Sequence, residues 1–296
     1  MTRQDRNTDP TDLNHSGTRA REGIVSGRDR NRGKHMSDMI DFDERAAKAV
    51  EAMYLTPDVV GQRTHVMAAM ALRPGMAALD IGVGPGLLAH DMGKAVTKTG
   101  KVTGIDMSRP MVEMASKRCA DMPWVTMEHG EAEQIPMANE SVDVVVSTQV
   151  YEYVTDMGAA LREAKRVLKP GGKIVILDTD WDSIVWHSSN RERMERVLKA
   201  WDAHLVDPHL PRKLPHLLHQ AGMTVTRREL IPMFNPDWNP HSYSAGIMRG
   251  IQGFVSGRDG ISEDEAKAWA DDLKTLGADG AYFFSLNRYL FVAVKT

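Results

Sequence analysis

The chain has 296 residues, of which 42% are hydrophobic, enough for one large α/β domain with insertions or for two smaller domains. Its net charge of −3 excludes a strong overall attraction to nucleic acid, and no apolar run approaches the roughly 18 residues that span a bilayer. Cys119 is the single cysteine, which excludes an internal disulfide and a cysteine-based zinc site.

The first 35 residues are mostly Arg, Asp, Asn, Thr, Ser and Gly. Such a segment has too few apolar side chains to compensate for the entropy lost on ordering, so we expect a disordered polar arm over residues 1–35. The segment contains no apolar stretch of the kind found in secretory signals. The sequence therefore favours a cytoplasmic protein.

Residues 36–76 predict an N-terminal helical cap. Its first helix has apolar residues at helical spacing, namely Ala46, Ala49, Val50 and Met53. A second helix is expected over about 57–72. The sequence Arg73-Pro74-Gly75 then ends the helical pattern.

Strands and helices alternate over the next hundred residues. The expected strands are 77–81, 101–105, 125–129, 142–147 and 173–177. The expected helices are 87–96, 110–119 and 158–168. The run 142–147 is rich in β-branched residues, which is typical of a strand buried on both faces. This alternation predicts an α/β fold with a doubly wound, mostly parallel sheet, whose core domain covers residues 77–232.

The alternation loosens in the last third of the chain. The expected elements are helices 191–205 and 211–220, strand 223–231, helices 241–255 and 262–276, and a long final strand over 281–294. Residues 233–280 therefore form a helical insertion before the final strand segment, 281–296. Such insertions usually lie over the carboxyl ends of the strands, where ligands bind. Its apolar residues would form a substrate lid: Met233, Phe234, Trp238, Tyr243, Met248 and Phe254.

Residues 79–86, LDIGVGPG, are the most informative motif. Its three glycines are Gly82, Gly84 and Gly86. Dinucleotide-binding loops have glycines at the first, third and sixth positions, whereas Leu87 is sixth when counted from Gly82. The loop suits a ligand without a phosphate, because glycines let the backbone approach closely and Asp80 favours a cationic group. A helix cap is the structural alternative for Asp80.

Asp106 follows the next expected strand, about twenty residues after the glycines. In nucleoside-binding α/β folds a carboxylate at this place accepts hydrogen bonds from ribose hydroxyls. A turn residue at the strand end is the alternative.

With the glycine loop and the segment 104–111, the sequence resembles the class I S-adenosylmethionine-dependent methyltransferases. Segment 130–136, GEAEQIP, resembles the ubiquinone/menaquinone C-methyltransferase-like (methyltransferase domain 11 type) branch, and segments 141–147 and 166–172 match later parts of the family pattern. The resemblance covers about residues 45–180 well and the C-terminal third loosely. It implies a seven-stranded Rossmann-like methyltransferase sheet with an antiparallel last strand, and S-adenosyl-L-methionine as cofactor.

The resemblance also implies residues for the adenosine part of the cofactor. Met107 would pack on the adenine. Glu131 would accept a hydrogen bond from the adenine amino group, and the Ala132 amide would meet a ring nitrogen. Glu131 stands where the family usually has Asp, and a solvated side chain is its alternative.

The methionine part of the cofactor would meet residues from two regions. Thr148 and Gln149 leave the fourth strand, where the family's backbone meets this part. Upstream, Tyr54 and the pair Gln62-Arg63 would fold over it as a lid, with Arg63 pairing with its carboxylate. A solvated helix face is the alternative for these residues.

Candidate catalytic and acceptor residues follow the fourth and fifth strands. Those after the fourth are Tyr151, Glu152 and Tyr153. Those after the fifth are Asp180, Trp181, Trp186 and His187. His187 could act as a general base near neutral pH, and the tryptophans could line an acceptor site. The alternative is that the tryptophans pack the insertion onto the sheet and that His187 is a surface residue.

A metal-assisted mechanism would need acidic residues after both strands. Asp178 and Asp180 supply one set, but Thr148 and Gln149 occupy the other, so we expect no metal.

The sequence therefore predicts an S-adenosylmethionine-dependent methyltransferase that transfers a methyl group to a small-molecule acceptor by in-line displacement. The lack of a basic domain and the apolar insertion favour a small acceptor over nucleic acid. Two alternatives stay open: a quinone-type C-methyltransferase at a membrane surface, and a non-catalytic cofactor-binding scaffold protein. The sequence leaves the acceptor atom and a homodimer undecided.

Overall fold

The computed structural model describes residues 44–296, with side chains from Lys48 onward. The polar arm predicted over residues 1–35 lies outside the described residues. None of the helices in the described part is both long and apolar enough to cross a membrane.

Two helices precede the sheet, α2 (Glu44–Tyr54) and α3 (Pro57–Met70). Pro57 occupies the first turn of α3, where the missing N–H leaves no hydrogen bond unmade. Ala71 follows the last residue of α3 as its C-cap; it is left-handed (φ 48°), and its amide donates to the Met67 carbonyl. This cap precedes the turn into the first strand.

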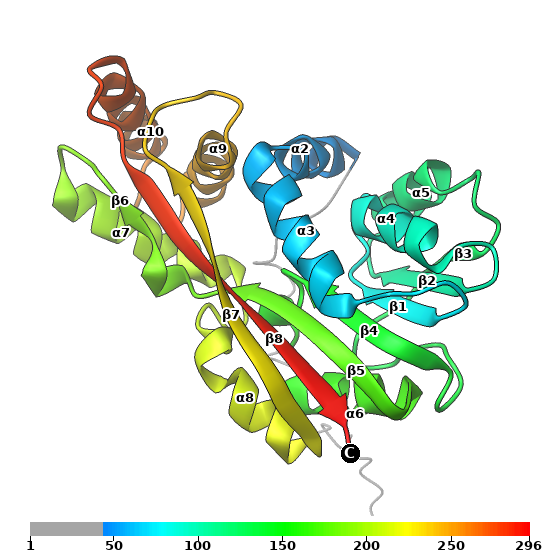
Figure 1. The fold of residues 1–296 in the computed structure, drawn as a ribbon. Helices are drawn as coiled ribbons and strands as arrows, with labels where there is room; N and C mark the ends of the chain where they lie inside the picture. Colours follow the sequence, from blue (N-terminus) through cyan, green and yellow to red (C-terminus); the bar gives the residue numbers. More distant parts are fainter. Residues whose placement is uncertain (1–43) are drawn as a thin grey trace, which may run out of the picture. The chain divides into compact units, whose positions relative to one another are not determined.

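An eight-stranded mixed sheet forms the centre of the fold (Figure 1). Its parallel strands are β1 (Ala77–Ile81), β2 (Lys101–Asp106), β3 (Val125–His129), β4 (Val142–Thr148) and β5 (Leu168–Thr179). The helices between them are α4 (Leu87–Val96), α5 (Arg109–Arg118) and α6 (Met157–Val167). The spatial order is β3-β2-β1-β4-β5-β8-β6, with β7 also paired to β8. The predicted doubly wound, mostly parallel sheet is confirmed.

The C-terminal strands form a long antiparallel ribbon, β7 (Met223–Asn235) and β8 (Phe284–Lys295), which Figure 1 shows in yellow and red. Strand β8 is antiparallel to β5, as predicted. The two-residue strand β6 (Val185–Trp186) pairs with β8 and is the strand that the sequence did not predict. The accompanying helices are α7 (Arg191–Trp201), α8 (Leu210–Gln220), α9 (Tyr243–Val255) and α10 (Glu263–Ala278). Short 3₁₀ turns are η1 (Tyr151–Tyr153), η2 (Trp181–Ser183) and η3 (Asp202–His204).

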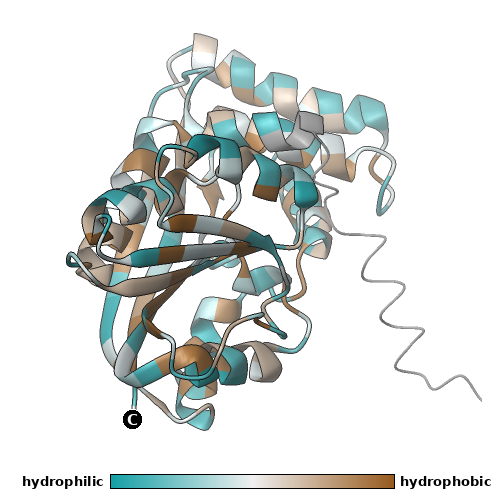
Figure 2. Cartoon of the chain, turned by 90° about the vertical axis from the view of Figure 1, so that its right-hand side faces the viewer, coloured by the Kyte–Doolittle hydropathy of each residue, from teal (hydrophilic) through white to brown (hydrophobic). Residues whose placement is uncertain are grey.

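Buried apolar residues form three clusters. One joins α3, α4 and α5 to one face of the sheet, and the second joins α6 and α8 to the other face. The third joins α7, α9 and α10 to the end of the β7–β8 ribbon. The helices carry both hydrophobic and hydrophilic segments, as expected for helices with one buried face (Figure 2). Each fully buried aliphatic side chain stabilises the fold by about 1.5–3 kcal/mol, so the clusters fix where the strand ends lie.

Candidate functional site

The glycine loop lies at the carboxyl end of β1, which pairs with β2 on one side and β4 on the other. The amides of Gly82 and Val83 both donate to the Ile105 carbonyl, at 2.8 and 2.9 Å. Gly86 is the N-cap residue of α4. The loop is therefore fastened to β2 at its start and to α4 at its end, which leaves Gly84 at its middle.

The three glycines are needed for different reasons. A Cβ on Gly82 would lie 2.2 Å from Val150 Cγ2, and one on Gly86 would lie 2.7 Å from the Ala115 Cα. A Cβ on Gly84 would meet Tyr54 Cε2 at 4.0 Å, an ordinary contact. The backbone therefore packs against protein at Gly82 and Gly86, whereas Gly84 faces the space under Tyr54.

Asp80 lies beneath this loop and is 1% exposed. Its two carboxylate oxygens are buried and accept no hydrogen bond from any residue that the structure describes. Burial, with a smaller contribution from the Asp106 carboxylate, raises the pKa of Asp80 to about 8. The helix-cap alternative is wrong, because α4 has no side-chain cap. A buried carboxylate with two empty acceptor oxygens is suited to a cationic ligand group.

Asp106 ends β2 and holds the loop with its carboxylate. One oxygen accepts from the Gly84 amide at 2.9 Å, and the other accepts from the Ser108 amide at 2.8 Å. Burial raises the pKa of Asp106, and the two amides oppose this rise. The residue thus combines the turn contact expected of a strand end with a contact to the glycine loop.

The residues predicted for adenine lie at the ends of β2 and β3. Met107 is 58% exposed, and its carbonyl contacts His129 Nε2 at 3.0 Å. Glu131 is exposed and bridges to Gln134, while Ala132 is buried. An exposed methionine beside the loop leaves an apolar surface available to a planar ring.

Two ion pairs hold the N-terminal helices over the loop. Arg63 on α3 pairs with Asp91 on α4 at 2.9 Å, and Arg118 on α5 pairs with Glu51 on α2. Arg118 also donates to the Pro85 carbonyl at 2.7 Å. Tyr54, predicted as a lid residue with Arg63, lies next to Gly84. We call helices α2 and α3 the cap.

The exit of β4 has a left-handed residue. Gln149 has φ 58°, a conformation that costs a non-glycine residue about 1–3 kcal/mol. Its amide donates to the Leu177 carbonyl at 2.8 Å, and its side-chain oxygen accepts from Thr179 Oγ1 at 2.6 Å. Together with its neighbour Thr148, Gln149 is thereby fixed at the carboxyl ends of β4 and β5.

The two clusters of candidate acceptor residues meet in the structure. Glu152, in η1, is 1% exposed and accepts a hydrogen bond from Trp181 Nε1 at 3.0 Å. Burial raises the pKa of Glu152 to about 7, while Trp181 and Arg288 act to lower it. Tyr151 is fully buried, and its hydroxyl has no hydrogen-bond partner among the described residues. Burial, reinforced by Asp178, raises the pKa of Tyr151.

His187 and Trp186 follow the η2 turn. His187 is exposed, and its backbone amide donates to the Phe283 carbonyl at 3.0 Å. The Trp186 ring packs against Phe284 at 4.7 Å and Trp269 at 5.5 Å between ring centroids. Trp186 therefore packs against the insertion, which was the alternative to a role in the acceptor site. Among the described residues, no interaction joins the His187 ring to Glu152.

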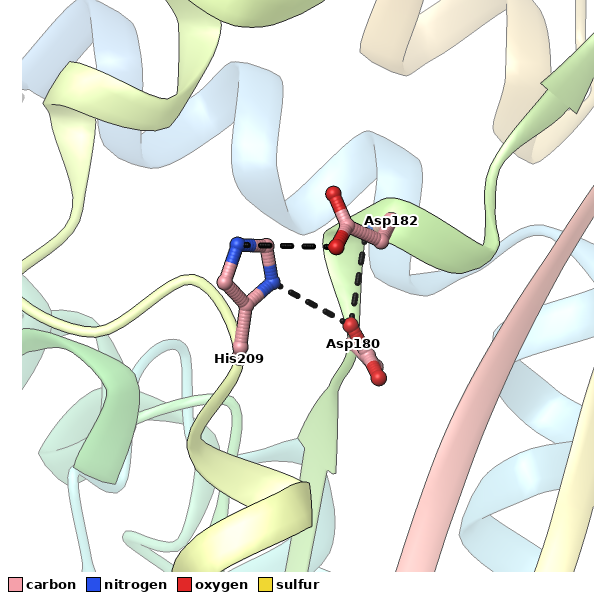
Figure 3. Close-up of side chains that lie close together, drawn as sticks. All are labelled: Asp180, Asp182 and His209. Atoms are coloured by element: carbon pink, nitrogen blue, oxygen red, sulfur yellow. Dashed lines mark hydrogen bonds and ion pairs between the residues drawn. The ribbon is translucent and has the colours of Figure 1, made fainter.

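Asp180 belongs to a cluster of charged residues with Asp182 and His209 (Figure 3). Three ligand atoms of this cluster lie within 4.8 Å of one another. However, Arg212 donates to Asp180 Oδ2 at 2.7 Å and to Asp182 Oδ2 at 2.7 Å. His209 Nδ1 contacts Asp180 Oδ1 at 3.2 Å. Since Arg212 already compensates both carboxylates, the cluster fastens η2 to α8.

Sequence reasoning missed Arg288, which lies on β8 opposite Thr179, the last residue of β5. Its guanidinium donates to Gln62 Oε1 and, at 2.8 Å, to the Tyr243 hydroxyl. The sequence contained a signal, because Arg288 interrupts the inward face of β8, which otherwise reads Phe284, Leu286, Leu290 and Val292. A buried arginine on an apolar strand face calls for a partner.

Residues 79–176 match the family described as methyltransferase domain. A relative in Streptomyces fradiae, an uncharacterized 37.1 kDa protein in transposon Tn4556, is 33% identical over 239 residues. That alignment covers 79% of this chain and 67% of the relative. The demethylmenaquinone methyltransferase of Staphylococcus aureus is 43% identical over 117 residues, which are 40% of this chain and 48% of that enzyme. The match therefore spans about half the length of the demethylmenaquinone methyltransferases.

Solved structures share the fold. A Haemonchus contortus phosphoethanolamine N-methyltransferase in complex with S-adenosyl-L-methionine matches with a TM-score of 0.58 and 21% identity, covering 92% of this chain and 60% of that chain. The YcgJ protein of Bacillus subtilis matches with a TM-score of 0.55 and 20% identity, covering 80% and 98%. With the motif order, the sheet order and these matches, the chain belongs to the S-adenosylmethionine-dependent methyltransferases that carry this methyltransferase domain.

Proposed function

We propose that the protein binds S-adenosylmethionine at the loop between β1 and α4 and transfers its methyl group to a small-molecule acceptor. The observation that carries this proposal is Asp80, a buried carboxylate beneath the loop with both oxygens unpartnered among the described residues. The α-ammonium group of the cofactor's methionine part is a cation of the right kind for it. Pairing with that group would compensate the charge that burial disfavours.

The proposed contacts with the adenosine part of the cofactor are inferred from where the residues lie around the glycine loop. Asp106 would accept from the ribose hydroxyls, since its carboxylate is already oriented by two backbone amides. Met107 and the Glu131–Ala132 segment would hold the adenine. Gly84 lets the backbone approach the ligand closely, because no protein atom lies nearer than Tyr54 to its missing side chain.

The methionine part would lie between the β4 exit and the cap. Thr148 and Gln149 would contact it from the strand ends. Tyr54 would cover it from α2. Arg63 is already paired with Asp91. It would therefore make its predicted contact with the methionine carboxylate while it keeps this ion pair.

When bound, S-adenosylmethionine supplies an electrophilic methyl group on a sulfonium. The protein's own contribution is to orient the acceptor and to exclude water. The buried tyrosines of this region favour the exclusion of water. Tyr151 is fully buried, and Tyr243 is 1% exposed. We infer that these buried groups keep the transfer site dry.

For an acceptor that loses a proton, we propose Glu152 as the general base. It is buried at the β4 exit, and a pKa of about 7 suits proton transfer near neutral pH. Among the residues predicted to be catalytic, His187 is exposed and Asp180 is held by Arg212. Tyr151 keeps its proton because burial raises its pKa. We therefore prefer Glu152 to all three.

A small acceptor is supported by the apolar helices of the 233–280 insertion. Tyr243 and Met248 on α9 are each 1% exposed, and Trp269 on α10 is fully buried. A quinol acceptor is the second candidate, supported by the 43% identity with the S. aureus demethylmenaquinone methyltransferase over part of the chain.

The proposed function is tested by measuring S-adenosylhomocysteine release with a panel of small thiols, amines, phenols and quinols. We expect release with at least one class of acceptor, and a weaker cofactor affinity in Asp106→Ala. No cofactor binding by the wild-type chain, or an unchanged affinity in Asp106→Ala, would overturn the proposed cofactor site. Methylation of quinols alone would select the second candidate.

A further inference from the structure

We propose that the methyl acceptor carries a carboxylate group and that Arg288 binds it. The inference rests on the proposed function and names the substrate class of that site. Arg288 is 2% exposed, and arginine is almost never this buried without a partner.

The hydrogen bonds of Arg288 fix one side of its guanidinium. One terminal nitrogen donates to Gln62 on α3, and the other donates to the Tyr243 hydroxyl on α9. The guanidinium carbon also lies 4.8 Å from the Tyr243 ring centroid. Both partners are neutral groups. They orient the guanidinium and leave its positive charge uncompensated.

The Nε atom of Arg288 is buried and donates to no residue within the described part of the chain. An arginine binds a carboxylate through two parallel N–H groups, and Nε with the adjacent terminal nitrogen forms such a pair. That terminal nitrogen carries two N–H groups and gives one to the Tyr243 hydroxyl, so a planar carboxylate could accept from the other and from Nε without displacing Gln62. Lysine could not reproduce this two-point contact.

The acidic residues near Arg288 do not take that place. No carboxylate among residues 48–296 lies within 4.0 Å of the guanidinium, the limit for an ion pair. Glu152 is close enough for its pKa to be lowered by Arg288, but its carboxylate accepts from Trp181. Asp178 also faces this region and accepts from the Val150 amide at 3.2 Å. A buried cation without a contacting anion is destabilising, and a bound carboxylate would offset this penalty.

Arg288 also lies beside the proposed cofactor site. It is directly opposite Thr179 in the β5–β8 ladder, and Thr179 donates to Gln149. Tyr54, which lies next to Gly84, has its pKa raised to about 12 by burial, an effect that Arg288 opposes and Asp106 reinforces. The Tyr54 hydroxyl thus senses both the guanidinium and the cofactor-binding acid. An acceptor anchored on Arg288 would place its other end toward the methyl group.

The test measures ligand binding to the protein saturated with S-adenosylhomocysteine. Benzoate, phenylacetate, salicylate and indole-3-acetate are compared with their carboxamides by calorimetry or ligand-observed NMR. We expect at least one carboxylate to bind about 10- to 100-fold more tightly than its amide, the range for a lost charged hydrogen-bond pair. Arg288→Gln should abolish this preference, and Arg288→Lys should restore part of it.

Arg228→Gln is the matched control, because Arg228 lies exposed on the neighbouring strand β7 and should not affect binding. S-adenosylhomocysteine affinity reports whether each variant folds. Equal binding of acids and amides, no binding of any carboxylate, or an unchanged preference in Arg288→Gln would overturn the inference. Failure of S-adenosylhomocysteine to bind the wild-type chain would instead refute the proposed function on which the inference rests.

Discussion

The indole N–H of Trp181 donates a hydrogen bond to the carboxylate of Glu152, 3.0 Å away. This bond joins the segment after β5 to the segment after β4, so two motifs that are about 30 residues apart in the sequence form one site. It also opposes the effect of burial on the pKa of Glu152, which reaches about 7. The bond therefore positions the group that we propose as base and adjusts its acidity.

Glu152→Gln should lower kcat by about 10²- to 10⁴-fold with an acceptor that loses a proton, because the base is removed while the side-chain volume is kept. In the wild-type enzyme, the rate should rise with pH through about 7 and level off above it, since only the ionised carboxylate accepts a proton. Steady-state kinetics between pH 5.5 and 9 measure both effects.

Trp181→Phe serves as the companion variant, since it removes the donor that lowers the pKa of Glu152. Its pH–rate profile should shift to higher pH without losing the plateau. A pH-independent rate in the wild-type enzyme, or an active Glu152→Gln, would show that the transfer needs no base at this position.

His187→Ala should change kcat and KM by less than about twofold, because surface substitutions away from a site have small effects. The side chain is exposed, and its backbone contact with Phe283 does not depend on the imidazole. The same kinetic assay checks this. A large loss of activity that is rescued by added imidazole would return the role of base to His187.

Gly84→Ala and Gly86→Ala should differ in kind. Alanine at Gly84 has room and costs only its left-handed conformation, roughly 1–2 kcal/mol, but its methyl group projects where the cofactor is proposed to bind. Alanine at Gly86 adds a clash with the Ala115 backbone, about 1–3 kcal/mol more. Urea unfolding and cofactor titration should therefore show a stable, weakly binding Gly84→Ala and a less stable Gly86→Ala. Equal stability of the two variants would contradict this account of the loop.

The cap should control cofactor exchange. Glu51→Ala and Asp91→Ala each remove an ion pair that holds α2 or α3 over the loop. Such partly exposed pairs are worth about 0.2–1 kcal/mol, so each variant should release bound cofactor up to about fivefold faster. A chase experiment with labelled cofactor measures the rate. Arg191→Ala, which breaks the exposed pair with Glu195 on α7, should leave the rate unchanged, and equal rates in all three variants would exclude a cap that opens.

Most of the fold could be predicted from the sequence because each element had a local signal. Strand β1 and helix α4 begin and end where the glycine loop and the apolar pattern place them. Strand β6 could not be predicted, since two residues carry no periodicity and pair with β8 only through tertiary contacts. Strand β7 runs four residues past its predicted end, because β8 provides a partner along its whole length.

The functional residues could be predicted only where their position in the sequence identifies their role. Asp80 and Asp106 were recognisable because each lies at or next to the end of a strand, at a fixed distance from the glycines. The role of Asp180 was not, because its partner Arg212 is 32 residues away in sequence. Arg288 was missed for a similar reason: its partner Gln62 is 226 residues away, and only the fold brings β8 against α3.

Asp80→Asn should stabilise the protein without cofactor. With its pKa raised from 3.8 to about 8, Asp80 binds a proton in the folded chain that the unfolded chain has released. The free energy of unfolding therefore falls by up to about 1.4 kcal/mol per pH unit as pH rises from 4 to 8. Asparagine removes this dependence, so the melting temperature of the variant should exceed that of the wild type increasingly from pH 6 to 9. A melting temperature below that of the wild type at pH 9 would contradict the assignment of an unpaired buried acid.

The most direct test of the account is calorimetric titration of the wild-type chain and Asp80→Asn with S-adenosylmethionine from pH 6 to 9. Because the ammonium group binds the ionised carboxylate, wild-type affinity should weaken about tenfold per pH unit below 8, with proton release that is visible in buffers of different ionisation enthalpy. Asp80→Asn should bind at least about tenfold more weakly at pH 8 and release no proton. Equal affinity of the two proteins at pH 8, or a wild-type affinity that does not depend on pH, would contradict the proposed cofactor site.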